Sequence, residues 1–202
     1  MTMRLWLGGL VLAAVVALAP VTAFAQSGGG QGGFEIGDRL VPGSGDVAGF
    51  TEITWDDLIP PDWIPEDLFQ GLFDDVDVDA LEDYDPRAME VMDRIRALWD
   101  AAPVVPDMDG RRVRIPGFVV PLEGDGKEIH EFLLVPYFGA CIHVPPPPAN
   151  QLIHVMPDEA VPAMWNMMPV WVSGVVSVIR QDTDMGIAGY QMQGMRVEAY
   201  EE

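Results

Sequence analysis

Short apolar runs separated by glycines fill the chain from residue 110 to residue 200, and this pattern constrains the fold more than any other feature. The runs are GRRVRIPGFVVPLE, IHEFLLVPYF, NQLIHVMP, PVWVSGVVSVI and AGYQMQGMRVEAY. Partly alternating apolar residues bounded by Gly and Pro predict β-strands. Five such strands within about 90 residues predict a small all-β barrel or sandwich.

The first of these runs carries Gly117 inside the predicted strand rather than at its end, and the fourth carries Gly174 in the same way. A glycine within a strand permits the sharp bend that a small barrel needs. We therefore predict a mainly β protein with a five-stranded OB-like barrel over residues 110–202, and an open sandwich is the alternative.

The segment before the barrel, residues 49–109, mixes aromatic residues, carboxylates and prolines, as in ITWDDLIPPDWIPEDLF. We predict an irregular acidic arm with short helical turns that packs on the barrel. Within it, DPRAMEVMDRIRALWDAA places apolar residues at steps of three and four, which predicts one amphipathic helix with Asp85 as N-cap and Pro86 at its first position. The apolar positions are Met89, Met92, Ile95 and Trp99.

The N-terminus predicts export. MTMRLWLGGLVLAAVVALAPVTAFA has one basic residue, an apolar run and an A-x-A ending, which is typical of a signal peptide over residues 1–25 cleaved after Ala25. A membrane anchor is the alternative, but the run is short for a span of about 20 residues. Residues 26–48 are rich in glycine and predict a flexible leader. We expect a periplasmic protein whose mature chain does not span the membrane.

Acidic residues dominate the charge, with 32 Asp and Glu against 11 Lys and Arg and a formal net charge of −21. Such a surface repels nucleic acid and anionic lipid headgroups. We predict no nucleic-acid partner. We attribute most of the negative charge to solubility. Non-specific attraction of cations is the alternative interpretation.

The stretch FGACIHVPPPPANQ contains Cys141, the single cysteine of the chain, and His143 two residues later. A lone exported cysteine is a buried inert thiol, half of an intermolecular disulfide, a metal ligand or a nucleophile. In an extended segment, residues i and i+2 point to the same face, so this pair has workable zinc geometry. The following prolines, Pro145 to Pro148, favour a stiff extended connection.

A zinc site needs three or four ligands, and the chain has two more histidines, His154 and His130. We predict a site of Cys141, His143 and His154, with Glu123 among many carboxylates that could complete it. Zinc is the first candidate. Copper(I) is the second, because methionines such as Met156 suit a soft ion, although methionine more often fills gaps in a core.

Nucleophilic catalysis is the other chemistry open to a cysteine beside a histidine. Asn150 is the candidate for orienting such a histidine. The chain has no C-x-x-C, G-x-S-x-G, phosphate-loop or dinucleotide motif. We therefore predict that the protein is not an enzyme.

Several stretches resemble one family, domain of unknown function 3299. They are ITWDDLIPPD, VRIPGFVVPLE, EFLLVPYFGACIHVPPPPANQ, PVWVSGVV and AGYQMQGMRVEAY, and together they span about residues 50–200. The resemblance implies an exported bacterial protein that accompanies an ABC transporter similar to macrolide exporters and a histidine-rich exported protein under zinc control. Its motif implies functional positions at Cys141, His143, Asn150 and Gln151.

Two functions follow as hypotheses. In the first, the protein is a periplasmic zinc-binding accessory of an ABC-type transport system, and its partner is a transporter subunit or another periplasmic metal-binding protein. Cys141, His143 and His154 are then ligands, and Asn150 and Gln151 are binding residues. In the second, the protein is a non-catalytic adaptor without metal, and Cys141 and His143 are structural.

Overall fold

The structure is a computed structural model that describes residues 33–41, 46–64, 86–140 and 146–200. Among the described residues, one α-helix, α2 (Pro86–Asp100), precedes the barrel. The 3₁₀ helices are η1 (Asp56–Leu58), η3 (Pro106–Met108), η4 (Ala149–Gln151) and η5 (Ala163–Trp165). The strands are β1 (Asp46–Val47), β2 (Phe50–Glu52), β3 (Arg112–Gly124), β4 (Glu128–Val135), β5 (Ile153–Pro157), β6 (Val161–Pro162), β7 (Pro169–Ser177), β8 (Gln181–Thr183), β9 (Gly186–Ala188) and β10 (Tyr190–Ala199).

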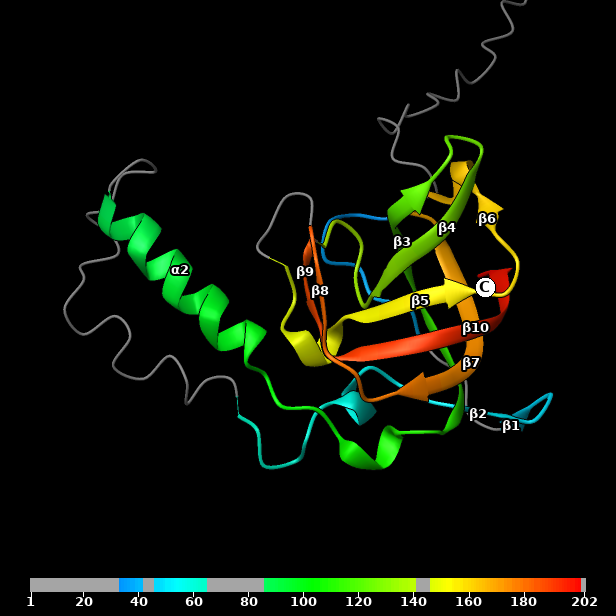
Figure 1. Ribbon diagram of the computed structural model, residues 1–202, viewed down its shortest axis with the longest axis horizontal. Helices are drawn as coiled ribbons and strands as arrows, with labels where there is room; N and C mark the ends of the chain where they lie inside the picture. Colours follow the sequence, from blue (N-terminus) through cyan, green and yellow to red (C-terminus); the bar gives the residue numbers. More distant parts are fainter. Residues whose placement is uncertain (1–32, 42–45, 65–85, 141–145, 201–202) are drawn as a thin grey trace, which may run out of the picture.

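Five strands close a barrel in the order β3-β7-β10-β5-β4, because β4 also pairs with β3. Strands β5 and β10 run parallel, and the other neighbours in the barrel are antiparallel. This is a small mixed barrel of the OB type (Figure 1). The predicted fold class is confirmed, and the open sandwich is wrong.

Glycines inside β3 and β7 let neighbouring strands approach closely. A Cβ atom at Gly174 would collide with the backbone carbonyl oxygen of Gln193 on β10 and lie 2.9 Å from Cγ of Met192. A Cβ at Gly117 would lie 2.7 Å from Cγ of Leu134 on β4. Both positions therefore require glycine for the barrel to close.

The interior of the barrel is filled by apolar side chains that alternate along its strands. Outward-facing residues lie between them, so the alternation read from the sequence marks the core. The inward set includes Val113, Ile115, Val119, Phe132, Leu134, Ile153, Val155, Val172, Val176 and Met192.

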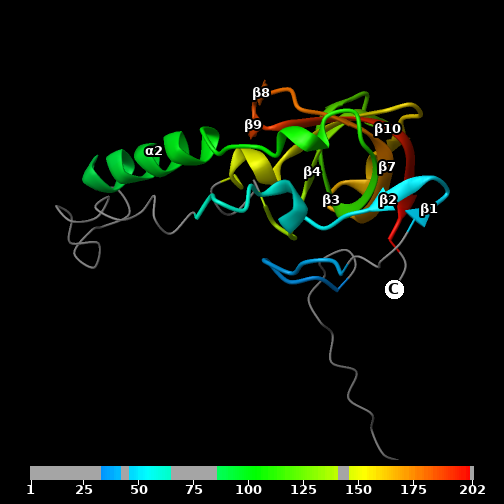
Figure 2. The same cartoon turned by 90° about the horizontal axis from the view of Figure 1, so that it is seen from below.

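A second apolar cluster lies on the outer side of β3 and β4. Phe118 is fully buried there, and its ring lies 5.3 Å from Phe34 and 5.7 Å from Phe138 between centroids. Leu40 joins the same cluster. Phe34 and Leu40 belong to the segment predicted as a leader, and Figure 2 shows residues 33–41 in blue along this side of the barrel. The chain itself therefore covers part of the outer face.

The arm enters the barrel core through buried side chains. Ile53, Trp55 and Leu58 join the interior cluster, and the indole N–H of Trp55 donates to the carbonyl oxygen of Pro116 at 2.7 Å. The rest of the predicted arm includes residues 65–85, which lie outside the described residues.

The predicted helix is confirmed as α2, with Pro86 at its first position, but Met89 and Met92 of its predicted apolar stripe are exposed. Its proposed N-cap, Asp85, lies outside the described residues. The helix extends away from the barrel and contacts it at β9 (Figures 1 and 2). Arg180 binds the chain where the helix ends, donating to the carbonyl oxygens of Asp100 and, at 2.7 Å, Ala102. None of the described helices has both the length and the apolar character needed to cross a membrane.

Candidate functional site

The predicted site residues fall in three places. Cys141 and His143 lie in residues 141–145, outside the described residues, so their ligand role stays a prediction. Asn150 and Gln151 form part of η4, and His154 lies on β5.

Asn150 and Gln151 are buried and bind backbone groups of the arm. Nδ2 of Asn150 donates to the carbonyl oxygen of Pro103 at 2.9 Å, and Nε2 of Gln151 donates to that of Trp55 at 2.9 Å. Their exposed fractions are 0% and 5%. These contacts tie the arm to the barrel, and the predicted binding role of the two amides stays a prediction.

His154 projects from the outer face of β5 and is buried, with two polar neighbours. Its Nε2 lies 2.9 Å from Oε2 of Glu131 on β4, and its Nδ1 lies 3.4 Å from Nε2 of Gln191 on β10. A carboxamide nitrogen can only donate, so Nδ1 accepts and Nε2 carries the proton that is donated to Glu131. Both ring nitrogens of His154 are therefore engaged.

A cleft of about 460 Å³ opens beside His154, between the outer faces of β3, β4 and β5 and the β8–β9 hairpin. This hairpin lies between the fourth and fifth barrel strands, β7 and β10. OB barrels commonly bind ligands on the face of their second and third strands, beside this same loop. The carboxylates that line the cleft are those of Glu123, Glu131, Asp182 and Asp184.

The acidic lining makes the cleft favourable for positively charged ligands. Four carboxylates at one site attract a positively charged group. We call the space lined by these four residues and His154 the His154 cleft. Glu123, which the sequence analysis names among the carboxylates that could complete a zinc site, lines the His154 cleft.

His130, the weaker candidate for a third ligand, lies elsewhere on β4. It is exposed and close to Asp125 in the turn between β3 and β4. The backbone N–H groups of Glu128 and Lys127 lower the pKa of Asp125, and His130 adds a smaller lowering. Over the described residues, no three His, Cys, Asp or Glu side chains are grouped so that they could hold a metal ion.

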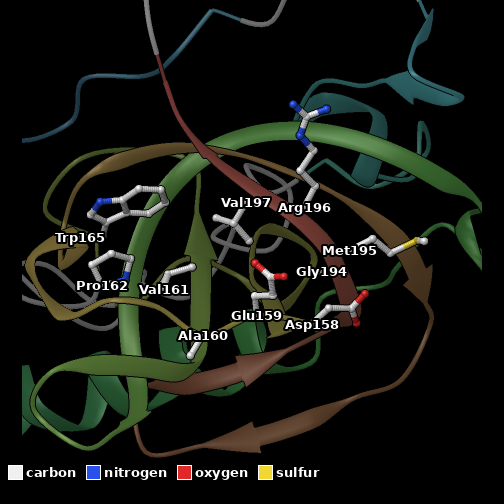
Figure 3. A pocket seen from close by; sticks show the side chains of 10 residues that line it. All are labelled: Asp158, Glu159, Ala160, Val161, Pro162, Trp165, Gly194, Met195, Arg196 and Val197. Carbon is white, nitrogen blue, oxygen red and sulfur yellow. The ribbon is translucent and has the colours of Figure 1, made fainter.

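A second pocket, of about 340 Å³, lies between β6, η5 and the far half of β10. Figure 3 shows Trp165 and Pro162 on one side and the carboxylates of Glu159 and Asp158 on the other. Reasoning from the sequence missed this pocket. Its walls come from two separate segments, residues 158–165 and residues 194–197, and no local motif marks it.

The fold and the His154 cleft together define a small OB-like barrel protein with an acidic cleft on its outer face. The chain belongs to the family described as protein of unknown function DUF3299, whose model matches residues 55–199. It is similar to the crystal structure of a DUF3299 family protein from Pseudomonas aeruginosa PAO1, with 35% identity over 76% of this chain and 97% of that one and a TM-score of 0.57. No curated protein matches the chain.

Proposed function

We propose that this protein is an exported, non-catalytic binding module that holds a positively charged side chain of a partner protein in the His154 cleft. The observation that carries the proposal is the set of four carboxylates around a buried, hydrogen-bonded histidine on the usual ligand face of an OB barrel. The resemblance to exported proteins beside an ABC transporter suggests a transporter subunit in the periplasm as the partner.

The contacts of His154 give it a positioning role. Its Nε2 lies 2.9 Å from the Glu131 carboxylate on β4, and its Nδ1 lies 3.4 Å from the side-chain nitrogen of Gln191 on β10. His154 is a positioning residue that holds the Glu131 carboxylate at the edge of the cleft.

An arginine or lysine side chain suits this lining better than other ligands. Nucleic acid and acidic peptides would be repelled by the carboxylates. Arginine in particular donates through a planar fork to carboxylates and binds them in a bidentate manner. We therefore expect an arginine of the partner to pair with Glu123 and Asp182, which come from opposite walls of the cleft.

Binding of a short arginine peptide tests this proposal. We expect acetyl-Gly-Arg-Gly-Arg-Gly-amide to shift the amide resonances of Glu123, Glu131 and Asp182, because its guanidinium groups pair with the cleft carboxylates. Affinity should fall at least about tenfold in the Glu123→Gln/Asp182→Asn variant, equal to about 1.4 kcal/mol. It should also weaken with salt.

The matched controls are Asp107→Asn, which removes an exposed carboxylate outside the cleft, and the peptide with glutamate in place of arginine. The first should leave the affinity unchanged, and the second should not bind. Equal binding of the arginine peptide to the wild type and the double variant would contradict the proposal.

Zinc binding at Cys141 and His143 is the second candidate function. A thiolate and an imidazole are the donors that zinc prefers. Pro146, the first described residue after these two, lines a cavity of about 380 Å³ that shares Asp182 and Asp184 with the His154 cleft. Carboxylates that could complete a site therefore line the same cavity as Pro146. His154 would join such a site through Nδ1 by giving up its contact with Gln191, while Nε2 could keep its bond to Glu131.

Metal content tests the second candidate. We expect about one zinc per chain in the mature protein purified without chelator, and loss of that zinc in both Cys141→Ala and His143→Ala, because each removes a ligand. Mass spectrometry of folded, monodisperse samples measures it and also detects copper. A wild-type protein that stays free of metal after zinc is added to the reduced thiol would rule this candidate out.

A further inference from the structure

Strand β10 is longer than the strand beside it, which leaves part of one edge open. Its first half, Tyr190–Gly194, pairs with β5 on one side and with β7 on the other. Its second half, Arg196–Ala199, pairs only with β7. Strand β5 ends at Pro157, and just beyond it the N–H of Asp158 donates across to the carbonyl oxygen of Gly194 on β10 at 2.8 Å.

The direction of the free backbone groups follows from the ladder with β7. The N–H of Tyr200 donates to the carbonyl oxygen of Pro169 at 3.0 Å, so Tyr200 faces β7. Hydrogen-bonding direction alternates along an antiparallel strand, so Glu198 and Arg196 also face β7. Val197 and Ala199 then turn their N–H and C=O groups to the other side, where none of the described strands pairs with them.

A register shift separates the two halves of β10. The pairing with β7 steps between Gly194 and Arg196, which leaves Met195 as an extra residue on β10. Such a β-bulge bends its strand and increases the local twist. The open edge therefore begins at the bulge, where β10 has also passed the end of β5.

The second pocket lies directly along this open edge. Val197 lines it from β10, Val161 from β6 and Trp165 from η5. Figure 3 shows the Glu159 carboxylate pointing into the pocket beside Val197, with the Trp165 ring on the far wall. The pocket thus combines unpaired strand backbone with an apolar wall and a carboxylate.

The charges within this pocket leave its carboxylates without a cationic partner among the described residues. Arg196, which also lines the pocket, is paired with Glu198 at 2.8 Å, and Asp158 accepts only from the neutral side chain of Gln193. Glu159 is exposed, and no described residue forms an ion pair with it. A partner that fits must therefore bring a positive charge near Glu159.

We propose that the open edge of β10 accepts an extended segment of a partner protein by β-strand addition. The added strand pairs with the backbone of Val197 and Ala199, places an apolar side chain against Trp165 and Val161, and places a lysine or arginine beside Glu159. Backbone pairing supplies affinity and the alternate side chains supply specificity in this binding mode. The site is separate from the His154 cleft, and the inference does not depend on that cleft.

Selection from a display library of eight-residue peptides on the immobilised mature protein tests the proposal. Peptides that also bind the Val197→Pro variant are discarded during the selection. This substitution removes the outward N–H of Val197 without removing a bond to β7. We expect enriched sequences to alternate β-branched residues with a lysine or arginine. The best peptide should bind Glu159→Lys at least about tenfold more weakly and should slow amide exchange at Val197 and Ala199 in the wild type.

Trp165→Ala and Glu159→Lys give the readout if Val197→Pro fails to fold, because both changes lie outside the β10 ladder. Both should weaken the selected peptide while Glu123→Gln leaves its affinity unchanged. Peptides without a basic residue, peptides that bind Glu159→Lys as well as the wild type, or unchanged amide exchange at Val197 would each overturn the proposal. Failure of the library to yield any peptide that protects Val197 would do the same.

Discussion

Replacing Gly174 by alanine is expected to destabilise the protein by more than about 3 kcal/mol, the upper part of the range for overpacked sites. The added methyl group would collide with the backbone carbonyl oxygen of Gln193 on β10. Backbone in a paired strand cannot rotate away as a flexible side chain can. Relief therefore requires β7 and β10 to separate, which opens the barrel. Urea unfolding followed by tryptophan fluorescence measures the loss.

Gly126→Ala is the control for this experiment. Gly126 has a positive φ of +85°, and a Cβ atom there meets no other atom within 4 Å. The substitution should cost about 1 kcal/mol, the penalty for an L-residue in this backbone region. The difference between the two variants then isolates the collision at Gly174. Equal losses in both variants would contradict the account of how the barrel closes.

Replacing Tyr190 by phenylalanine is expected to lower the free energy of unfolding by at least about 2 kcal/mol. The Tyr190 hydroxyl donates to the carbonyl oxygen of Leu58 at 2.8 Å and accepts from the N–H of Val105 at 2.7 Å. Phenylalanine leaves both backbone groups unpaired, and each buried group without a partner costs about 1 to 3 kcal/mol. Tyr190 is fully buried, so water cannot replace the hydroxyl.

Tyr200→Phe is the matched control, because the Tyr200 hydroxyl donates to the carbonyl oxygen of Val41 at 3.0 Å at an exposed position. Its loss should change stability by no more than about 0.5 kcal/mol. Thermal and urea unfolding of the two variants measure the contrast. A Tyr190→Phe variant as stable as Tyr200→Phe would show that the arm is not held to the barrel through this hydroxyl.

The same residue gives a pH dependence. Burial raises the pKa of Tyr190 above its ordinary value of 10.0. The unfolded chain then loses this proton at a lower pH than the folded protein. The contribution of the protonated Tyr190 hydroxyl to the free energy of unfolding is therefore fully present below pH 10. It is lost as pH rises through the folded-state pKa. Above pH 10 the wild type should lose stability more steeply than Tyr190→Phe, and parallel curves would contradict this assignment.

The barrel could be predicted from the sequence because the pattern that specifies each barrel strand lies within that strand. Each barrel strand carries its own apolar alternation, and Gly117 and Gly174 mark the bends within β3 and β7. The β8–β9 hairpin was not predicted as a separate element. Its strands have three residues each, too few for a periodic pattern to show.

The environment of the site residues could not be predicted, because it depends on distant segments. The residue type of His154 predicts a ligand, but its neighbours Glu131 and Gln191 lie 23 and 37 residues away in the sequence. Gln151 was selected from a motif, and its partner Trp55 lies 96 residues away. The sequence shows which side chains have the chemistry to bind or to coordinate a metal. The folded barrel determines which groups from distant segments they contact.

The His154 ring is the point at which the proposed module differs most from a zinc site. We propose to record its two nitrogens by long-range ¹H–¹⁵N NMR in the mature protein, during separate titrations with zinc and with the arginine peptide. The account predicts a ring that keeps its Nε2 proton and a Nδ1 without bound metal in both titrations, while the arginine peptide shifts the neighbouring carboxylate residues. Zinc coordination at either ring nitrogen with one equivalent of zinc, or an arginine peptide that leaves the cleft resonances unmoved, would contradict it.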